Sequence, residues 1–130
     1  MEFDPISREV IGAAIEVHRE LGPGLMESVY ERCLAHELRQ RGIECETQVP
    51  MPVAYKGETI EAGYRIDLLV RQCLMVELKS VDAINGLHKA QLLTYMKLAR
   101  VDTGLLINFN APVLKDGIRR LERRVSPTGL

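Results

Sequence analysis

Two strand-forming segments with a short polar break between them, YRIDLLV at 64–70 and LMVELKS at 74–80, constrain the fold more than any other feature. Side chains of a strand alternate between the two faces of a sheet, so each segment divides into two sets. One set is nearly all apolar: Tyr64, Ile66, Leu68, Val70, Leu74, Val76 and Leu78, followed by Ser80. The other set holds the charges of both strands: Arg65, Asp67, Leu69, Met75, Glu77 and Lys79. The pattern predicts a β-hairpin with one face in the core and its charges on the opposite face.

The register of this hairpin brings two carboxylates together. A turn centred on Gln72 sets Asp67 directly opposite Glu77. The same register sets Arg65 opposite Lys79. A turn centred half a residue away is disfavoured, because it would set the apolar face of one strand against the polar face of the other. Facing residues have Cβ atoms about 5 Å apart, so two carboxylates repel each other there unless a cation lies between them. Mg²⁺ and similar hard cations take such oxygen ligands, and Lys79 is placed to stabilise a developing negative charge.

The charged face also has a structural interpretation. Exposed sheet faces commonly carry charges, and Arg65 and Lys79 could simply neutralise Asp67 and Glu77. The hairpin taken alone leaves both interpretations open.

The rest of the chain alternates between helical and extended patterns. Asp4 and Pro5 begin the first helix well, because Asp is a good N-cap and Pro suits the first helical position. Helices are predicted at residues 5–21, 25–41 and 87–99. Extended segments are predicted at 43–55, 59–70, 74–80 and 103–109.

This order predicts an α/β fold with a mixed sheet flanked by helices. The first three extended segments have short links and should be antiparallel. The segment at 103–109 follows a crossover helix, so it should lie parallel to the segment at 74–80. We expect a single domain over 1–130, with 1–22 as an additional N-terminal helix and 111–130 as a basic C-terminal tail.

Composition narrows the class of protein. The chain has 130 residues, of which 46% are hydrophobic, and its net charge is -1. Nucleic-acid binding would therefore need a local basic patch. The sequence shows neither an apolar run of roughly 20 residues nor the pattern of a signal peptide. The three cysteines are widely spaced and are interpreted as reduced thiols, so we expect a cytoplasmic protein without a membrane partner.

The hairpin charges resemble a known catalytic motif. Asp67, followed by Glu77 and Lys79 in an ExK pattern, resembles the PD-(D/E)XK nuclease motif, although Ile66 stands where many members have Pro. That family has a core of helix, three antiparallel strands, helix and strand. In the third predicted helix, Gln91 and Tyr95 resemble the QxxxY motif of RecB-type nucleases in the same superfamily.

A narrower resemblance covers nearly the whole chain. The segment GLMESVY, from Gly24 to Tyr30, matches the signature of the GxxExxY proteins, which are assigned to this superfamily. The segments GYRIDLLV, VELKSV, AQLLTYMKL and GLLINF are also typical of that group. The resemblance implies a restriction-endonuclease-like fold. It also makes Glu27 a candidate third metal ligand, the alternative being a surface Glu stabilised near a helix N-terminus.

The resemblance implies a nuclease dependent on Mg²⁺ or Mn²⁺. Asp67 and Glu77 would hold the metal, Lys79 would assist the attacking water or the transition state, and Gln91 and Tyr95 would organise the substrate. Nucleic acid is the expected partner, with DNA favoured over RNA, and a homodimer is one way for a small nuclease to hold a duplex. The alternative is a catalytically inactive binding or assembly module with the same fold.

Several basic residues are candidates for contacts with phosphate. His88 shares a helix face with Gln91 and Tyr95, with helix capping as the alternative role. Arg65 lies on the charged face of the hairpin. Four arginines in the tail could also grip phosphates or simply be solvated: Arg119, Arg120, Arg123 and Arg124.

Overall fold

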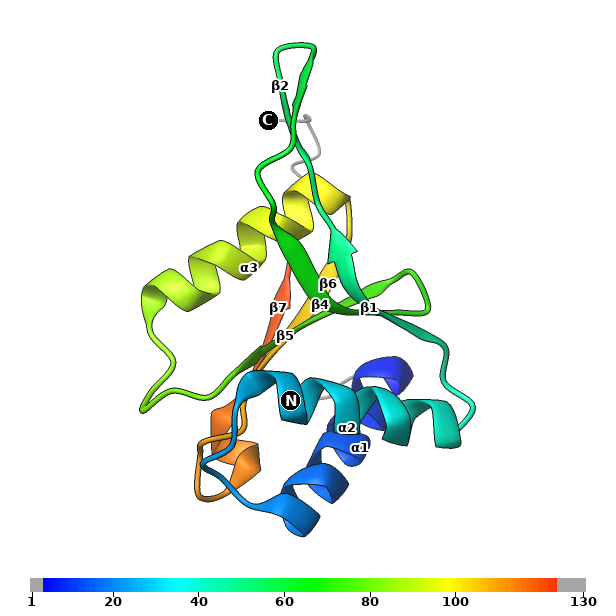
Figure 1. Cartoon of the computed structure of the whole chain (residues 1–130), viewed down its shortest axis with the longest axis vertical. Helices are drawn as coiled ribbons and strands as arrows, with labels where there is room; N and C mark the ends of the chain where they lie inside the picture. The colour runs from blue at the N-terminus through cyan, green and yellow to red at the C-terminus, as the bar shows by residue number, and fades with distance from the viewer. Residues whose placement is uncertain (1–3, 124–130) are drawn as a thin grey trace.

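A five-stranded sheet lies at the centre of the molecule with helices on both faces (Figure 1). The computed structural model describes residues 4–123. The helices are α1 (Pro5–Leu21), α2 (Glu27–Gln40) and α3 (Gly86–Ala99), with a short 3-10 helix η1 (Leu114–Gly117). The central strands are β1 (Cys45–Pro50), β4 (Arg65–Val70), β5 (Leu74–Lys79), β6 (Thr103–Asn108) and β7 (Ile118–Glu122). Two short strands form a separate hairpin: β2 (Val53–Tyr55) and β3 (Glu58–Ile60).

The sheet is mixed, as predicted. Its strand order is β1-β4-β5-β6-β7. β1 and β4 are antiparallel, as are β4 and β5, whereas β5 and β6 are parallel and are connected through α3. The arrangement confirms the predicted fold class and agrees with a restriction-endonuclease-like fold.

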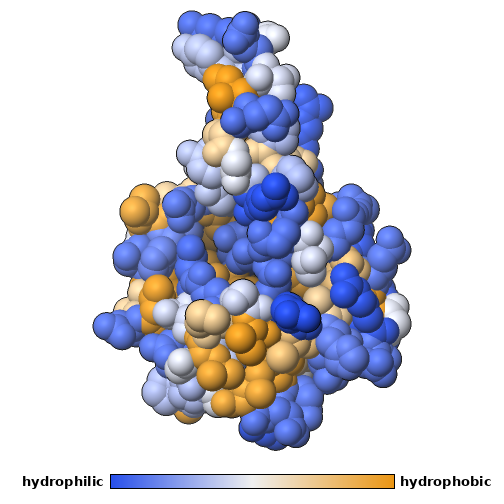
Figure 2. Space-filling model, viewed as in Figure 1, coloured by the Kyte–Doolittle hydropathy of each residue, from blue (hydrophilic) through white to orange (hydrophobic). Residues whose placement is uncertain are grey.

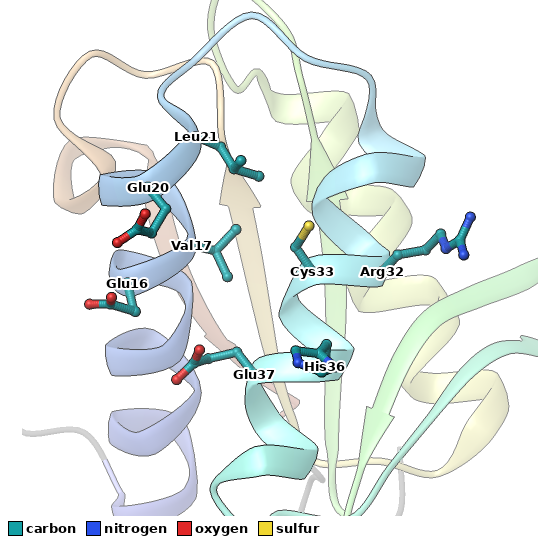
Figure 3. Close-up of a pocket in the computed structure, with 8 residues that line it drawn as sticks. All are labelled: Glu16, Val17, Glu20, Leu21, Arg32, Cys33, His36 and Glu37. Atoms are coloured by element: carbon teal, nitrogen blue, oxygen red, sulfur yellow. The ribbon is translucent and has the colours of Figure 1, made fainter.

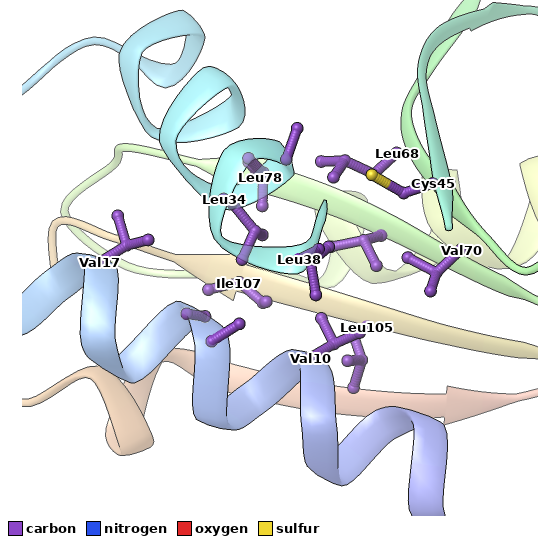
Figure 4. Close-up of a cluster of buried hydrophobic side chains, with 14 of the residues drawn as sticks. Val10, Val17, Leu34, Leu38, Cys45, Leu68, Val70, Leu78, Leu105 and Ile107 are labelled. Carbon is purple, nitrogen blue, oxygen red and sulfur yellow. The ribbon is translucent and has the colours of Figure 1, made fainter. Parts of the chain in front are cut away.

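One core fills the space between the sheet and the pair α1 and α2. Val10 and Val17 of α1 and Leu34 and Leu38 of α2 point toward the sheet (Figure 4). They meet the strand residues Leu68, Val70, Leu74, Val76, Leu78, Leu105 and Ile107. The burial of apolar side chains in such a core is the main driving force for folding.

A second core lies between the sheet and α3. It contains Met51, Ile66, Leu69, Met75, Leu92, Met96, Val101 and Leu106. The helix can approach β6 closely because Gly104 has no side chain: a Cβ there would lie 2.6 Å from the Sδ of Met96. The face of the hairpin that carries the charges is therefore mostly buried under α3, and its charges lie at the margin of this core.

One residue of the hairpin departs from the predicted alternation. We predicted Ile66 on the same face as Leu68, but Ile66 packs in the second core. The β1–β4 ladder pairs Thr47 with Leu68 and Val49 with Ile66, and between these pairs both Gln48 and Asp67 are unpaired. The register is the same on both sides of this break, and Gln48 has a φ of 51°, outside the extended range. The changed side of Ile66 therefore coincides with a local distortion of the strand pairing.

An arm projects from the sheet where a continuous strand was predicted. Instead of one strand over 59–70, β3 ends at Ile60 and β4 begins at Arg65. Gly63 lies between them with a φ of 78°, which breaks the extended chain. The β2–β3 hairpin therefore stands clear of the body, and its surface is mostly hydrophilic (Figure 2). Tyr64, predicted for the core face, is 46% exposed at the base of this arm.

The segment predicted as a basic tail contains a strand. β7 pairs antiparallel with β6, and its Ile118 and Leu121 pack against the two cores. This strand was not predicted, because an edge strand rich in Arg and Glu has little apolar alternation. In the part of the chain that the structure describes, no helix is both long and apolar enough to span a membrane.

Candidate active site

The predicted register of the β4–β5 hairpin is confirmed. Leu69 pairs with Met75 and Val70 with Leu74, so the turn centres on Gln72. The ladder ends at the pair of Leu68 and Val76. Past it, the side-chain carboxylates of Asp67 and Glu77 accept hydrogen bonds from backbone amides of the opposite strand. The amide of Asp67 donates to Oε1 of Glu77 at 3.2 Å, and the amide of Leu78 donates to Oδ2 of Asp67 at 2.9 Å. The two carboxylates therefore lie side by side where the ladder opens.

The electrostatics of this pair are unusual. Glu77 is only 9% exposed. Burial, followed by the charge of Asp67, raises the pKa of Glu77 from 4.5 to about 8. Burial also raises the pKa of Asp67, and the charge of Glu27 adds to the shift, while Lys79 acts in the opposite direction on both groups. The positive charge of Lys79 therefore does not outweigh burial and mutual repulsion, so the pair would gain from a further cation.

The break in the β1–β4 ladder brings the polar side chain of Gln48 to the pair. The side-chain amide of Gln48 donates to Oδ1 of Asp67 at 3.3 Å and also to Oε1 of Glu31. Glu31 belongs to α2, one turn after Glu27, and burial followed by the charge of Asp67 raises its pKa. Gln48 thus orients Asp67 and connects it to α2. The sequence analysis missed both Gln48 and Glu31.

The segment GLMESVY connects the first core to the end of β5. The φ of Gly24 is 98°, which favours glycine in the turn before α2. The hydroxyl of Tyr30 donates to the carbonyl of Gly22 at 2.6 Å and accepts from the amide of Leu25 at 3.1 Å. Its ring stacks on Phe109, with centroids 4.4 Å apart. These contacts fix the turn that carries Glu27.

Glu27 itself lies beside the end of β5. The amide of Ser80 donates to Oε1 of Glu27 at 3.3 Å, and the hydroxyl of Ser80 donates to the carbonyl of Leu25 at 2.8 Å. Glu27 also contributes to the raised pKa values of Asp67 and Glu77. The structure thus brings it close enough to act on the pair electrostatically.

A family model of the PD-(D/E)XK nuclease superfamily matches residues 4–121. The chain belongs to the PD-(D/E)XK nuclease superfamily. No curated protein and no solved structure matches the chain significantly. The superfamily predicted from the hairpin is therefore confirmed, while the narrower resemblance to the GxxExxY proteins stays a prediction.

Nucleases of this superfamily typically use a divalent metal, and the carboxylate pair has suitable chemistry for one. Carboxylates offer hard oxygen ligands, and a cation would relieve the repulsion that raises the pKa of Glu77. Within residues 4–123, no three or more His, Cys, Asp or Glu side chains are grouped so that they could hold a metal ion. Asp67 and Glu77 would thus supply two ligands and leave the others to water and substrate phosphate, as Mg²⁺ usually requires. Glu27 as a third ligand stays a prediction.

The polar loop after Lys79 is held by an asparagine that the sequence analysis missed. Asn108 is 3% exposed and ends β6 beside Lys79. Its Nδ2 donates to the carbonyl of Val81 at 2.9 Å, and its Oδ1 accepts from the amide of Val81 at 3.1 Å. This two-way bond fixes the chain directly after the ExK segment and so helps to position Lys79.

The residues predicted on α3 divide into two groups. Tyr95 is half-buried, and burial followed by the charge of Glu77 raises its pKa, so it lies within electrostatic reach of the site. Gln91 is exposed one turn earlier. His88 lies in a capping box, because its Nδ1 accepts from the amide of Asn85 at 3.1 Å. The imidazole therefore takes part in capping the helix N-terminus, while a contact of His88 with nucleic acid stays a prediction.

The arginines predicted to bind nucleic acid lie in different places. Arg65 is exposed and bonds to the carbonyl of Gln48 at 3.3 Å, beside the carboxylates. Arg119 is exposed on β7 and bonds to backbone carbonyls of its own segment. Arg120 is held by Asp4 and Glu122, with its side chain 13% exposed. Arg123 pairs with Asp102, and Arg124 lies outside the described residues. Among those arginines that the structure describes, Arg65 is the one bonded to a residue, Gln48, that contacts Asp67.

The molecule also has a cavity of about 570 Å³ between α1 and α2 (Figure 3). Val17 and Leu21 of α1 face Cys33 of α2 across it, while Arg32 points away. None of the residues predicted for the catalytic site lines this cavity. The candidate site is therefore separate from this cavity.

Proposed function

We propose that the protein is a divalent-cation-dependent nuclease that hydrolyses phosphodiester bonds of nucleic acid, with DNA the favoured substrate. The observation that carries this proposal is the facing pair of buried Glu77 and half-buried Asp67, with Lys79 on the strand of Glu77, in a chain of the PD-(D/E)XK nuclease superfamily. A divalent cation bound by the two carboxylates would activate water and neutralise charge on the phosphate.

The chain's own residues would act around that centre. Water would lose a proton as it attacks phosphorus, and the leaving oxygen would gain a proton as its bond to phosphorus breaks. Negative charge would build on the phosphate oxygens in between. The ammonium of Lys79 would donate hydrogen bonds to those oxygens or hold the attacking water. Gln48 and Asn108 would keep Asp67 and Lys79 in position through the contacts described above.

A direct assay tests the proposal. Purified protein is incubated with single-stranded and duplex DNA and RNA, with Mg²⁺ or Mn²⁺, and with EDTA as a control. We expect cleavage that requires the metal and that falls strongly in Lys79→Ala. If wild type cuts none of the substrates with either metal, the second candidate replaces the first: a nuclease-fold module that binds or assembles without chemistry. The net charge of -1 favours that module.

Metal binding can be tested separately from catalysis. We expect Mn²⁺ at about 100 times its dissociation constant to raise the melting temperature of wild type by roughly 10 °C. Asp67→Asn should lose this response, because it removes a ligand. Without metal, the same variant should melt at the same temperature as wild type or slightly above it, because repulsion with Glu77 is relieved.

The control for this melt is Asp116→Asn, which neutralises an exposed aspartate outside the site. It should keep the full response to Mn²⁺. An equal response in Asp67→Asn would exclude Asp67 as a ligand.

A further inference from the structure

A groove opens between the base of the β2–β3 arm and the exposed side of α3. Its volume is about 410 Å³. It is lined by Val53, Tyr64, Leu87, Ala90, Gln91, Thr94, Tyr95 and Leu98, and we refer to it as the Tyr64 groove. None of these side chains carries a formal charge. This neutral lining contrasts with the acidic pair close by.

Two aromatic rings define the groove. Tyr64 comes from the chain just before β4 and Tyr95 from α3, and their ring centroids lie 5.7 Å apart at an interplanar angle of 43°. Tyr64 is 46% exposed, so much of its ring is free to meet another flat surface. Hydrogen-bonding groups of Gln91 and Thr94 lie on the same lining. Aromatic rings with a few polar groups suit a flat, neutral heterocycle better than a charged group.

Tyr95 links the groove to the carboxylate pair. Tyr95 lines the groove and also lies within electrostatic reach of Glu77 and Asp67. Along β4, Tyr64 precedes Arg65, and Asp67 follows two residues later. Strand geometry sets the Cα atoms of Tyr64 and Asp67 roughly 10 Å apart. One nucleic-acid strand could therefore span from the Tyr64 ring to the Asp67 carboxylate.

We propose that the Tyr64 groove receives an unstacked nucleobase of a single-stranded substrate, while the adjoining phosphate lies at Asp67 and Glu77. A base inside a duplex is stacked on both faces and cannot enter between protein side chains without leaving the helix. Stacking on tyrosine is tolerant of sequence because every base has a π-face. The inference rests on the proposed nuclease function and makes single-stranded nucleic acid its substrate.

Binding measurements test the groove without relying on cleavage. The probes are a labelled 12-nucleotide oligo-dT, the same length of abasic sugar-phosphate chain, and a 12-base-pair duplex. Fluorescence anisotropy is recorded with Ca²⁺ in place of Mn²⁺. We expect oligo-dT to bind at least tenfold more tightly than the abasic chain, and more tightly than the duplex.

Substitutions at Tyr64 and at a control tyrosine separate the loss of stacking on the Tyr64 ring from a general loss of exposed aromatic surface. Tyr64→Leu should weaken oligo-dT binding about tenfold, while Tyr64→Phe, which keeps the ring, should bind as wild type does. The matched control is Tyr55→Leu on the arm, where Tyr55 is 58% exposed and does not line the groove. The control should leave binding unchanged. Tyrosine fluorescence gives a second readout, because the chain has four tyrosines and no tryptophan.

The outcomes distinguish this inference from the proposed function. Equal binding of oligo-dT and the abasic chain, or equal affinities of Tyr64→Leu and Tyr55→Leu, would overturn the nucleobase assignment even if the protein cleaves nucleic acid. A change of self-association in Tyr64→Leu with unchanged oligo-dT binding would also overturn it and would assign the groove to a second copy. Base-dependent binding without cleavage would sustain the groove and remove the nuclease proposal.

Discussion

Replacing Lys79 with alanine should lower the rate of metal-dependent cleavage by about 100-fold or more while leaving Mn²⁺ affinity close to that of wild type. Lys79 shares a strand and a face with Glu77 but is a cation, so it cannot be a metal ligand while charged. Its removal takes away stabilisation that grows as negative charge develops on the phosphate. Loss of one such donor typically costs 10²–10³ in rate.

The comparison that isolates this role uses Glu77→Ala and Lys115→Ala. Glu77→Ala should lose both metal affinity and turnover, because it removes a ligand. Lys115→Ala removes an exposed lysine of η1 and should behave as wild type. Mn²⁺ titration by calorimetry and a single-turnover time course measure the two properties separately. If Lys79→Ala cleaves as fast as Lys115→Ala, Lys79 serves only as a charge partner of the acids.

The sequence predicted the register of the central hairpin correctly because its alternation has one solution. A centre half a residue away would set the apolar face of one strand against the polar face of the other, so the centre at Gln72 follows from the pattern alone. The crossover strand was also predictable, since a continuous apolar run after a helix suits a strand buried on both faces.

Other parts of the fold depend on contacts that local patterns do not carry. The strand pairing is distorted at Gln48, which has a φ of 51°, and Ile66 lies in the second core beside this point; nothing in residues 43–55 marks that position. The strand β7 is stabilised by pairing with β6 and not by its own apolar content. Gly63 is the one residue in the sequence that indicated a break within the segment 59–70.

The residues of the candidate site also divide into those that local sequence patterns predict and those that depend on contacts in the folded chain. Asp67, Glu77 and Lys79 are adjacent in one hairpin, so their proximity could be predicted from spacing. Glu31 could have been found, since it lies one helical turn after Glu27. Asn108 reaches its partner across 27 residues of chain, and that contact exists only in the folded sheet.

In metal-free protein, stability should fall as the pH rises from 5 to 8.5, and Glu77→Gln should remove most of this loss. The pKa of Glu77 is about 8 in the folded chain and about 4.5 when unfolded. Below 4.5 both states keep the proton, and the stabilising contribution is fully present. Between these values the unfolded chain releases the proton first, so the free energy of unfolding declines through the folded pKa by an amount on the order of several kcal/mol.

The other shifted carboxylates do not reverse this sign. Burial raises the pKa values of Asp67 and Glu31 as well, so their contributions also fall with rising pH. Asp4 has the opposite sign, because hydrogen bonds from Ser7 and the nearby Arg120 outweigh burial and lower its pKa to about 2. Its contribution is lost only as the pH falls below about 3.8 and is complete at pH 5.

Urea unfolding in EDTA at pH 5, 7 and 8.5 measures the effect. Glu77→Gln keeps a carbonyl oxygen to accept the amide of Asp67 but carries no proton to lose. It should match wild type near pH 5 and become increasingly more stable than wild type toward pH 8.5. Glu58→Gln, an exposed glutamate on the arm, should follow the wild-type curve. Parallel curves for wild type and Glu77→Gln across this range would mean that Glu77 is not strained by its burial, and the argument for a cation between the two carboxylates would lose its physical basis.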